Sequence, residues 1–314
     1  MSNENVLKQG AVVLLVFLGF FLPTRSVAQE AVYVSSPLSH AIWKVWPDGS
    51  RSTFVSGLNS PTGLAFDRDG ILCVAVADSA GGTIDKVDAN GIAKPYISFP
   101  ATSSGLDGLA FDASGNLYAA YWTNNGPGYT GGIYKITPDG NASIFASGFI
   151  PLEMAFDANG NLFAADQTDH TIREITPGGV ASTFANAIAN PRGGDGPWGL
   201  AFDSNGDLFF SQPGLAAIYE ITTGGNIVKF SNVPEGPQGI AFDSQGNLMV
   251  AHLEYSGCFM SRIAPSGSIS TVPTGISNAS LNIADPAVKL PVPEPASVAL
   301  LSLAGSALLA RRRR

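Results

Sequence analysis

The chain has 314 residues, of which 36 are Gly and 21 are Pro, and only 13% are charged. Its hydrophobic content of 45% is enough to bury a large core, which excludes wholesale disorder. Without residues 1–28 and 293–314, 11 Lys and Arg and 23 Asp and Glu remain, a net charge of −12. This acidic balance argues against nucleic-acid binding and favours a cationic ligand, a metal ion or a neutral glycan.

The first 28 residues have the organisation of a secretion signal. Lys8 supplies positive charge, residues 11–22 are apolar, and residues 26–28 place small side chains before Gln29. This order is that of a cleavable signal peptide, and the apolar stretch is short for a membrane span. We therefore expect export and removal of residues 1–28, with an uncleaved membrane anchor as the alternative.

A repeat of 40 to 46 residues fills the middle of the chain. Its unit reads P-x-G-L-A-F-D-x-x-G-N-L, and its Phe-Asp pairs begin at positions 66, 111, 156, 202 and 242. This period is that of a propeller blade rather than of a helical repeat. An alternating apolar strand, an Asp-x-x-Gly turn and three further short strands can be read in each unit, which predicts four-stranded blades.

The number of blades follows from an incomplete copy. The second half of the unit occurs six times, and its earliest copy, residues 41–49, has no first half before it. Residues 281–285 are a degraded match to that missing half. We therefore predict an all-β, six-bladed β-propeller over residues 29–290, closed by strands from both ends. Five blades is the alternative if residues 281–285 are only a linker.

Residues 31 to about 285 resemble the NHL-repeat propellers and the wider group of SMP-30/gluconolactonase-like hydrolases and virginiamycin B lyase-like enzymes. The repeat unit carries the resemblance. The resemblance implies the propeller fold, but this fold carries catalysts and binding modules alike, so function has to be argued from a site.

The end of the chain is similar to the PEP-CTERM sorting signal of Gram-negative bacteria. A Pro-Glu-Pro motif, an apolar run over residues 296–310 and a basic cluster follow one another. The residues of the motif and cluster are Pro293, Glu294, Pro295, Arg311, Arg312, Arg313 and Arg314. The resemblance implies that residues 291–314 are a sorting tail with one transmembrane-like helix. Signal peptidase and an exosortase-like enzyme are then the processing partners, and the destination is the cell surface, envelope or extracellular matrix.

Two features are interpreted as structural. The Asp-x-x-Gly turns resemble calcium loops in part, but they lack a Glu at the EF-hand spacing and occur in five copies. Cys73 and Cys258 fall in non-adjacent blades, so we expect two buried, inert thiols rather than a disulfide.

Candidate ligand residues are those that vary where the repeat is otherwise constant. In propellers of this group the residue after the repeat Pro faces the channel, and here these residues are Thr62, Asp107, Leu152, Trp198 and Gln238. The end of the second strand is also expected at the channel mouth, with Val76, Tyr121, Asp166, Gln212 and His252. The predicted ligand-binding set is Thr62, Asp107, Trp122, Trp198 and Gln238.

Carboxylates at these positions predict a metal or catalytic site. Asp107, Glu153 and Asp166 are oxygen ligands suited to Ca²⁺ or Mg²⁺, and they match only in part the Glu, Asp and Asn set that the SMP-30-like resemblance implies. His252 and Glu254 are a candidate acid/base pair, as the resemblance to the lyases implies. The alternatives are a blade-stabilising Asp166 and solvated charges at the channel rim.

Aromatic residues favour a different function. Tyr121, Trp122, Tyr129, Trp198 and Tyr255 fall in or near the predicted loops at the channel mouth, and aromatic faces beside carboxylates and amides can hold a carbohydrate. We therefore expect a non-catalytic module that binds extracellular polysaccharide or a surface protein. The alternative is a metal-dependent hydrolase or lyase acting on a small lactone-like molecule.

Both ends of the chain can be tested directly. We expect mass spectrometry of the mature protein to find Gln29 at its N-terminus, because the small residues before it suit signal peptidase. Deletion of residues 292–314 should release the protein from the cell envelope. A mature protein that retains both termini intact would contradict the sorting hypothesis.

Overall fold

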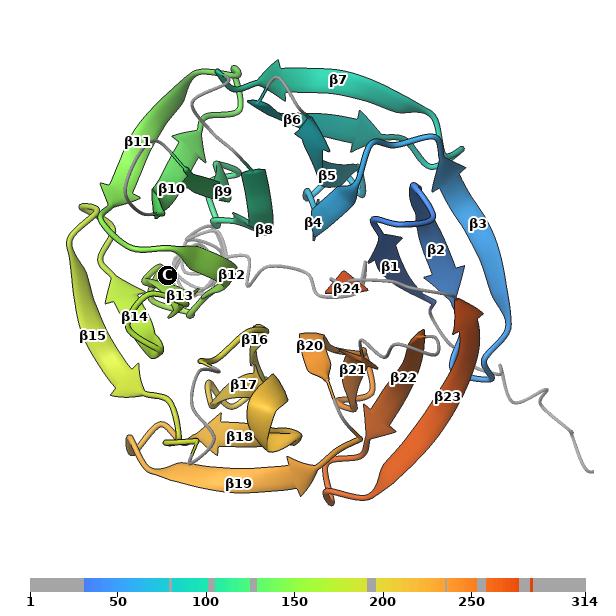
Figure 1. Ribbon diagram of the computed structural model, residues 1–314, viewed down its shortest axis with the longest axis vertical. Helices are drawn as coiled ribbons and strands as arrows, with labels where there is room; N and C mark the ends of the chain where they lie inside the picture. Colours follow the sequence, from blue (N-terminus) through green and yellow to red (C-terminus); the bar gives the residue numbers. More distant parts are fainter. Residues whose placement is uncertain are drawn as a thin grey trace, which may run out of the picture.

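The structure, a computed structural model, describes residues 31–78, 81–100, 105–124, 129–190, 196–234, 236–252, 258–276 and 283–284. Six four-stranded antiparallel sheets are arranged in a ring around a central axis (Figure 1). The predicted all-β, six-bladed propeller is confirmed. The predicted signal peptide and sorting tail lie outside the described residues. Within the described ranges, no helix has the length and apolar character needed to cross a membrane.

The first three blades each run from an inner strand beside the axis to an outer strand at the rim. Blade 1 consists of β24 (Ile283–Ala284), β1 (Val32–Ser36), β2 (Ala41–Val45) and β3 (Arg51–Ser56). Blade 2 consists of β4 (Pro61–Phe66), β5 (Leu72–Asp78), β6 (Gly81–Val87) and β7 (Ala93–Ser98). Blade 3 consists of β8 (Gly105–Phe111), β9 (Leu117–Thr123), β10 (Thr130–Ile136) and β11 (Ala142–Ser147).

The other three blades repeat this order. Blade 4 consists of β12 (Pro151–Phe156), β13 (Leu162–Asp166), β14 (Thr171–Ile175) and β15 (Ala181–Asn186). Blade 5 consists of β16 (Leu200–Phe202), β17 (Leu208–Gln212), β18 (Ala217–Ile221) and β19 (Ile227–Asn232), with a 3₁₀ turn η1 (Pro213–Leu215). Blade 6 consists of β20 (Pro237–Phe242), β21 (Leu248–His252), β22 (Cys258–Ile263) and β23 (Ile269–Ile276).

The ring closes inside blade 1, where the two ends of the repeat region meet. Strand β24 pairs antiparallel with β1, with Val34 opposite Ile283 and Tyr33 opposite Ala284. The segment that the sequence left open as strand or linker is therefore the inner strand of the first blade, and the five-blade alternative is wrong. Across the same junction, a guanidinium N–H of Arg51 donates to the Thr274 carbonyl of blade 6.

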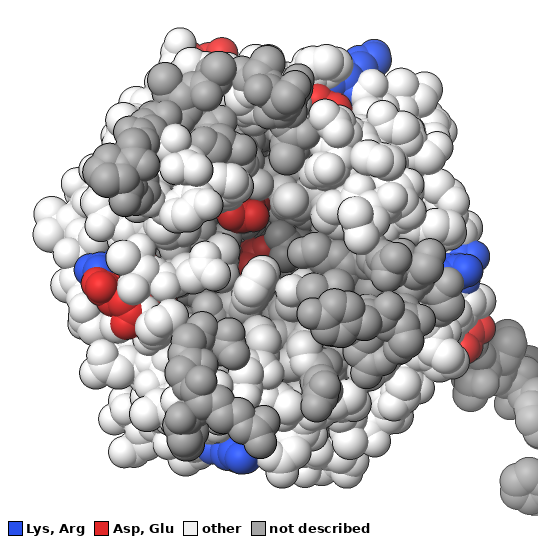
Figure 2. Space-filling view, in the orientation of Figure 1, with Lys and Arg blue, Asp and Glu red and all other residues white. Residues whose placement is uncertain are grey.

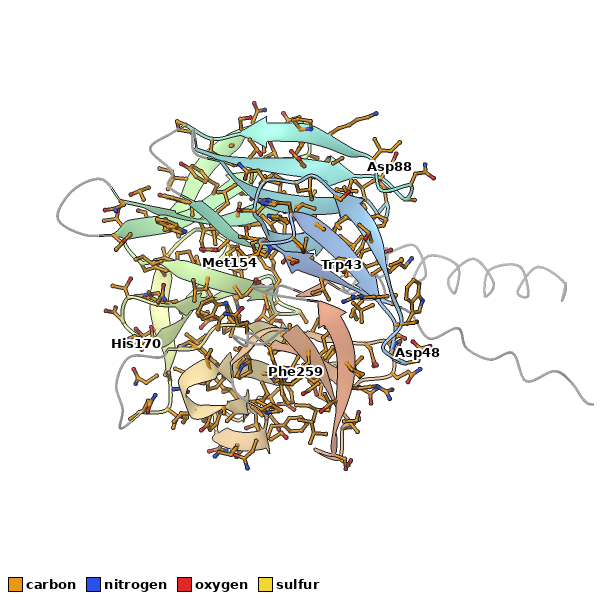
Figure 3. The ribbon with its side chains drawn as sticks, turned by 45° about the vertical axis from the view of Figure 1, so that its right-hand side comes forward. Trp43, Asp48, Asp88, Met154, His170 and Phe259 are labelled. Carbon is orange, nitrogen blue, oxygen red and sulfur yellow. The ribbon has the colours of Figure 1, made fainter. Side chains whose placement is uncertain are left out.

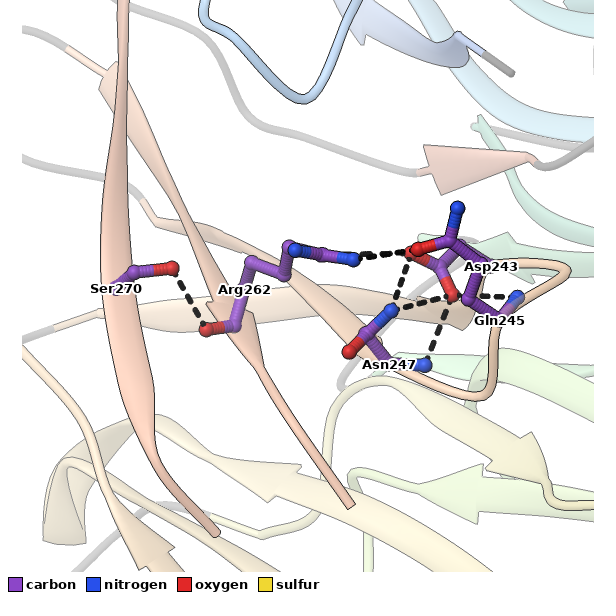
Figure 4. Close-up of polar contacts among 5 residues, drawn as sticks. All are labelled: Asp243, Gln245, Asn247, Arg262 and Ser270. Atoms are coloured by element: carbon purple, nitrogen blue, oxygen red, sulfur yellow. Dashed lines mark hydrogen bonds and ion pairs between the residues drawn. The ribbon is translucent and has the colours of Figure 1, made fainter. Parts of the chain in front are cut away.

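The Asp-x-x-Gly turns are held by their own aspartates, as predicted. In blade 6, Asp243 Oδ1 accepts the backbone N–H groups of Gln245 at 2.9 Å and Asn247 at 2.8 Å (Figure 4). Arg262 Nε lies 3.5 Å from the second carboxylate oxygen. The same pair of backbone contacts recurs at Asp67, Asp112, Asp157 and Asp203. These carboxylates cap turns, which explains why the residue is repeated.

Aromatic triads join neighbouring blades. A ring on the second strand of one blade contacts a ring on its outer strand and the repeat Phe on the inner strand of the next blade, each pair edge-on. The centroids of each contacting pair are 4.9 to 5.2 Å apart. The triads are Tyr33–Phe54–Phe66, Tyr118–Phe145–Phe156, Phe163–Phe184–Phe202 and Phe209–Phe230–Phe242. This inter-blade contact is the physical reason for the Phe of the repeat.

Cys73 takes the place of the central ring at the junction of blades 2 and 3. It shares one core cluster with Phe111 and with the partly buried Tyr96. The thiol is buried and free, and burial raises its pKa to about 12. A thiol in this environment remains protonated at neutral pH and is chemically inert, as the sequence predicted for Cys73.

We expect Phe209→Ala to lower the free energy of unfolding by about 3 to 5 kcal/mol, because the substitution removes the central ring of a triad and leaves a cavity. Phe209 is 5% exposed. Denaturant unfolding of the two proteins measures the difference. Val228→Ala, at a position of the same blade that is 44% exposed, is the control and should change stability little. Equal effects of the two substitutions would contradict the role of the triad.

Candidate functional site

Two neighbouring inner strands each carry one carboxyl side chain. Asp107 lies on β8 and Glu153 on β12, the inner strands of blades 3 and 4. Glu153 Oε2 lies 3.0 Å from the point that a Cβ on Gly108 would occupy, so the Glu153 side chain covers the residue next to Asp107. Figure 2 shows acidic surface at the hollow in the middle of this face. The face seen in Figure 2 is called the upper face below.

The glycine of the repeat explains why Glu153 is exceptional. A Cβ at Gly63 would lie 1.9 Å from the Asp107 carbonyl oxygen, and one at Gly108 would lie 2.4 Å from the Leu152 carbonyl oxygen. Neighbouring inner strands therefore approach too closely for a side chain at this place. Blade 4 carries Glu153 there, and the next inner strand, β16, has three residues where β4, β8, β12 and β20 have six or seven. Glu153 is therefore the one side chain at a place where the other four copies of the repeat have Gly63, Gly108, Gly199 and Gly239.

The indole of Trp122 holds Asp107. Gly105 at the start of β8 pairs with Trp122 on β9, and a Cβ on Gly105 would lie 2.6 Å from the indole Nε1. The indole therefore packs against Gly105, in the space that a side chain there would need, and its N–H donates a hydrogen bond to the Asp107 carboxylate. Burial raises the pKa of Asp107 to about 7, and the hydrogen bond from Trp122 limits this rise. Asp107 is consequently a carboxyl that changes charge near neutral pH.

Trp122 and Tyr129 form an aromatic corner next to this carboxyl. Their ring centroids are 5.8 Å apart and their planes meet at 65°. Tyr129 is 60% exposed. The hydroxyls of Thr123 and Thr130, 2.9 Å apart, link the two strands that carry the corner. The aromatic corner is therefore in contact with Asp107 through Trp122.

Positive charge is distant from the channel. None of the Lys and Arg side chains in the described part of the chain lies on the first or second strand of a blade. They lie on third or fourth strands or on a turn, and they are Lys44, Arg51, Arg68, Lys86, Lys94, Lys135, Arg173, Lys229 and Arg262. Figure 2 agrees, since its blue surfaces lie only towards the edge of the ring. The described basic side chains are thus confined to the outer part of the ring and its turns.

The other residues predicted after the repeat Pro serve the ring itself. The Thr62 hydroxyl donates to the Leu106 carbonyl of the next inner strand at 2.8 Å. Gln238 is 5% exposed, and its backbone carbonyl accepts a hydrogen bond from the Ser211 hydroxyl at 2.6 Å. Trp198 is partly buried and packs on the core cluster between blades 4 and 5. Of the predicted ligand set, the structure brings together Asp107 and Trp122.

The ends of the second strands are buried rather than open to the channel. Asp166, Gln212 and His252 are each 0% exposed. Asp166 accepts Arg173 Nε at 2.6 Å and the Thr168 backbone N–H at 2.8 Å, and the Gln212 amide bonds both backbone groups of Ile188. These polar side chains hold the loops of the upper face through hydrogen bonds. His170 lies on this face, and the turns at Asp48 and Asp88 lie on the opposite face (Figure 3).

His252 is not at the channel rim. Its ring stacks on Phe259 with centroids 4.4 Å apart, and its Nε2 lies 2.9 Å from the Ser261 hydroxyl oxygen. An imidazole enclosed in the blade in this way cannot reach a substrate in the channel. Its predicted partner, Glu254, lies outside the described residues, as does Tyr255.

The predicted metal ligands do not assemble. Both oxygens of Asp166 are engaged by blade 4 itself, which leaves Asp107 and Glu153. Within the ranges that the structure describes, no three His, Cys, Asp or Glu side chains are grouped closely enough to hold a metal ion. Two carboxylates, one of them already bound to an indole N–H, do not make the oxygen-rich shell that Ca²⁺ needs.

Sequence reasoning did not identify Gly105 or the bond between Trp122 and Asp107. Only the pairing of β8 with β9 places the indole across the glycine. The Gly at position 105 was no signal by itself, because the other copies of the repeat have Ser60, Ile150, Gly196 and Gly236 at the same place.

Comparisons with known proteins agree on the fold. Residues 26–145, which include blade 2 and most of blade 3, match the family model described as the SMP-30/Gluconolactonase/LRE-like region. Virginiamycin B lyase from Staphylococcus aureus has 20% identity, with 80% of this chain and 83% of that chain covered and a TM-score of 0.56. A gluconolactonase from Xanthomonas campestris has 17% identity, 72% and 80% coverage and a TM-score of 0.60.

A third similar structure is the calcium-binding protein regucalcin from Agrobacterium tumefaciens, with 18% identity, coverage of 68% of this chain and 75% of that chain, and a TM-score of 0.57. A search of curated proteins found no match. At these identities the likeness extends to the six-bladed fold, and function has to be argued from the channel.

We expect the Asp107 carboxyl to titrate near pH 7, because burial favours its neutral form. The folded protein binds this proton more tightly than the unfolded chain. The contribution of Asp107 to stability is therefore present below about pH 4 and lost as the pH rises through about 7. NMR titration of the side chain measures the midpoint. Trp122→Phe should raise it further and Trp46→Phe should not, whereas a wild-type midpoint near 3.8 would contradict the assignment.

Proposed function

We propose that this chain is an exported, envelope- or matrix-associated binding module that holds a glycan at the upper mouth of its channel. The observation that carries the proposal is the aromatic corner of Trp122 and Tyr129, which adjoins the carboxyl of Asp107. Sugar rings bind against aromatic faces while carboxyl groups accept bonds from their hydroxyls. Tyr129 is largely exposed, so the corner is open to a ligand.

Export and surface sorting support a glycan rather than a soluble metabolite. Residues 1–28 read as a signal peptide and residues 291–314 resemble the PEP-CTERM tail. Signal peptidase and an exosortase-like enzyme are the processing partners in this proposal. Extracellular polysaccharide is then the abundant ligand at the destination, and a surface protein is the other candidate partner.

A metal-dependent hydrolase or lyase is the second candidate. It is favoured by the family match over residues 26–145 and by the two carboxyl groups at the channel. Against it, the imidazole of His252 is enclosed in blade 6. The described carboxylates also provide no three-ligand set.

Binding to polysaccharide tests the first candidate. We expect the purified protein to bind members of a glycan array, and Trp122→Ala to weaken binding by about tenfold or more, because the substitution removes one face of the corner and the donor to Asp107. Trp46→Ala is the matched control, since Trp46 precedes the Asp48 turn on the opposite face. Loss of binding in both variants would point to misfolding, and no binding by the wild type would contradict the proposal.

A thermal melt separates the two candidates. A divalent ion at about 100 times its Kd would stabilise the fold by roughly 2.7 kcal/mol and raise the midpoint by several degrees. For a binding module we expect millimolar Ca²⁺ and excess EDTA to give the same midpoint. A rise with Ca²⁺ that is lost in Asp107→Asn would instead favour the hydrolase or lyase.

A further inference from the structure

The direction of strand β1 fixes the face at which the propeller begins. Strand β1 runs from Val32 to Ser36, and Ser36 pairs with Ala41 across the turn that joins β1 to β2. The equivalent turn of blade 4 carries His170, which lies on the upper face (Figure 3). Ser36 is therefore at the upper end of β1, and Val32 lies towards the opposite face, which carries the turn at Asp48. This opposite face is called the lower face below.

Strand β24 directs the chain out of the ring at the lower face. It pairs antiparallel with β1, with Ile283 opposite Val34 and Ala284 opposite Tyr33. Because Tyr33 is nearer than Val34 to the lower end of β1, the chain runs towards the lower face as it passes from residue 283 to residue 284. The chain therefore enters and leaves the ring on the same side.

The aromatic corner lies on the other side. Trp122 is near the end of β9, the second strand of blade 3, and Tyr129 directly precedes β10. The connection from β9 to β10 is equivalent to the turn that carries His170, so the corner belongs to the upper face. The point where the chain leaves towards the sorting tail and the proposed glycan site are thus on opposite faces.

The chain between the ring and the apolar run of the tail is short. Eleven residues, 285–295, separate β24 from residues 296–310, and they span at most about 40 Å when fully extended. A route around the outside of a blade crosses four strands, about 14 Å, and then follows their length for about 17 Å. Side chains and outer turns lengthen this route further. A membrane that holds the tail is therefore reached directly from the lower face, whereas a route past the upper face uses nearly all of the available chain.

The charge of the lower face does not supply the orientation. The turns between first and second strands lie on this face, and they contain the capping residues Asp67, Asp112, Asp157, Asp203 and Asp243. Carboxylates are not attracted to the negative surface of a membrane that contains anionic lipids. The short connection, rather than an affinity of the lower face for lipid, therefore sets the orientation.

We propose that the anchored propeller holds its lower face towards a phospholipid bilayer and the Trp122–Tyr129 corner away from it. The inference rests on the sorting tail of the function proposed above and adds a direction to that function. A polysaccharide outside the membrane then reaches the corner without passing between the protein and the lipid headgroups. The lower face is covered by the bilayer that holds residues 296–310.

Energy transfer to labelled lipid measures this orientation. The chain from residue 29 to 314, carrying Cys258→Ser, is placed in phosphatidylcholine vesicles that contain an acceptor lipid. A donor dye is attached through Leu38→Cys, in the β1–β2 turn, or through Ser50→Cys, in the β2–β3 turn, and both positions are exposed. Cys73 is buried and does not compete for the dye. We expect the donor at position 50 to lie about 17 Å nearer to the bilayer, which is the length of the five-residue strand β2.

A longer connection is the control. With about twenty Gly and Ser residues inserted after residue 290, the two distances should become equal, because a flexible linker of this length no longer restricts the domain. A difference that persists would overturn the inference in this form, since the lower face would then bind lipid by itself. A shorter distance from position 38 in the chain without the insertion would also overturn it, because the chain would then turn back to the upper face.

The failures of the two proposals are distinguishable. Vesicles that do not retain the chain would remove the sorting tail and the orientation together. A donor at position 50 that lies nearer to the bilayer, combined with no binding to any glycan, would remove the glycan ligand and keep the orientation. Glycan binding combined with equal distances in the chain without the insertion would overturn the orientation alone.

Discussion

The contact between neighbouring blades is the constraint on which the rest of the molecule depends. Inner strands approach so closely that Gly63 and Gly108 have no room for a side chain, and farther out an aromatic triad fills four of the junctions. Six such junctions have to close into one ring, and the pairing of β24 with β1 completes it. The channel and its mouth are a product of this closure, because each wall comes from a different blade.

Much of the fold could be predicted because the residues that recur in the repeat are the ones that stabilise each blade. The Asp of each turn bonds two backbone N–H groups and the Phe enters a triad, so both residues recur with the blade period. Closure of the ring could also be predicted, because the first half of the repeat unit is missing before residues 41–49 and a match to it occurs at residues 281–285. The second-strand residue is Tyr or Phe in the four triads and is Cys73 between blades 2 and 3, and for this reason sequence alone did not identify the triads.

The site was predicted less completely, for a geometric reason. Strand alternation defines two faces of a blade, but it does not say which face is open to the channel and which is enclosed by loops. Asp166 and His252 were expected at the mouth and are 0% exposed. Asp107 lies on the inner strand β8, but its pKa is set by burial and by a hydrogen bond from Trp122, and the indole reaches it only through the pairing of β8 with β9.

Closure by a strand of two residues has a consequence for how the protein is made. Strand β1 is synthesised early and β24 last, with some 250 residues between Val34 and its partner Ile283. Until β24 is synthesised, the inner edge of β1 in blade 1 stays unpaired, while the other five sheets can already form from local hairpins. Such an edge is a template for pairing with another chain. The nascent chain is thus most prone to self-association just before β24 has been synthesised. A chain whose synthesis stops before residue 283 would keep the edge of β1 unpaired.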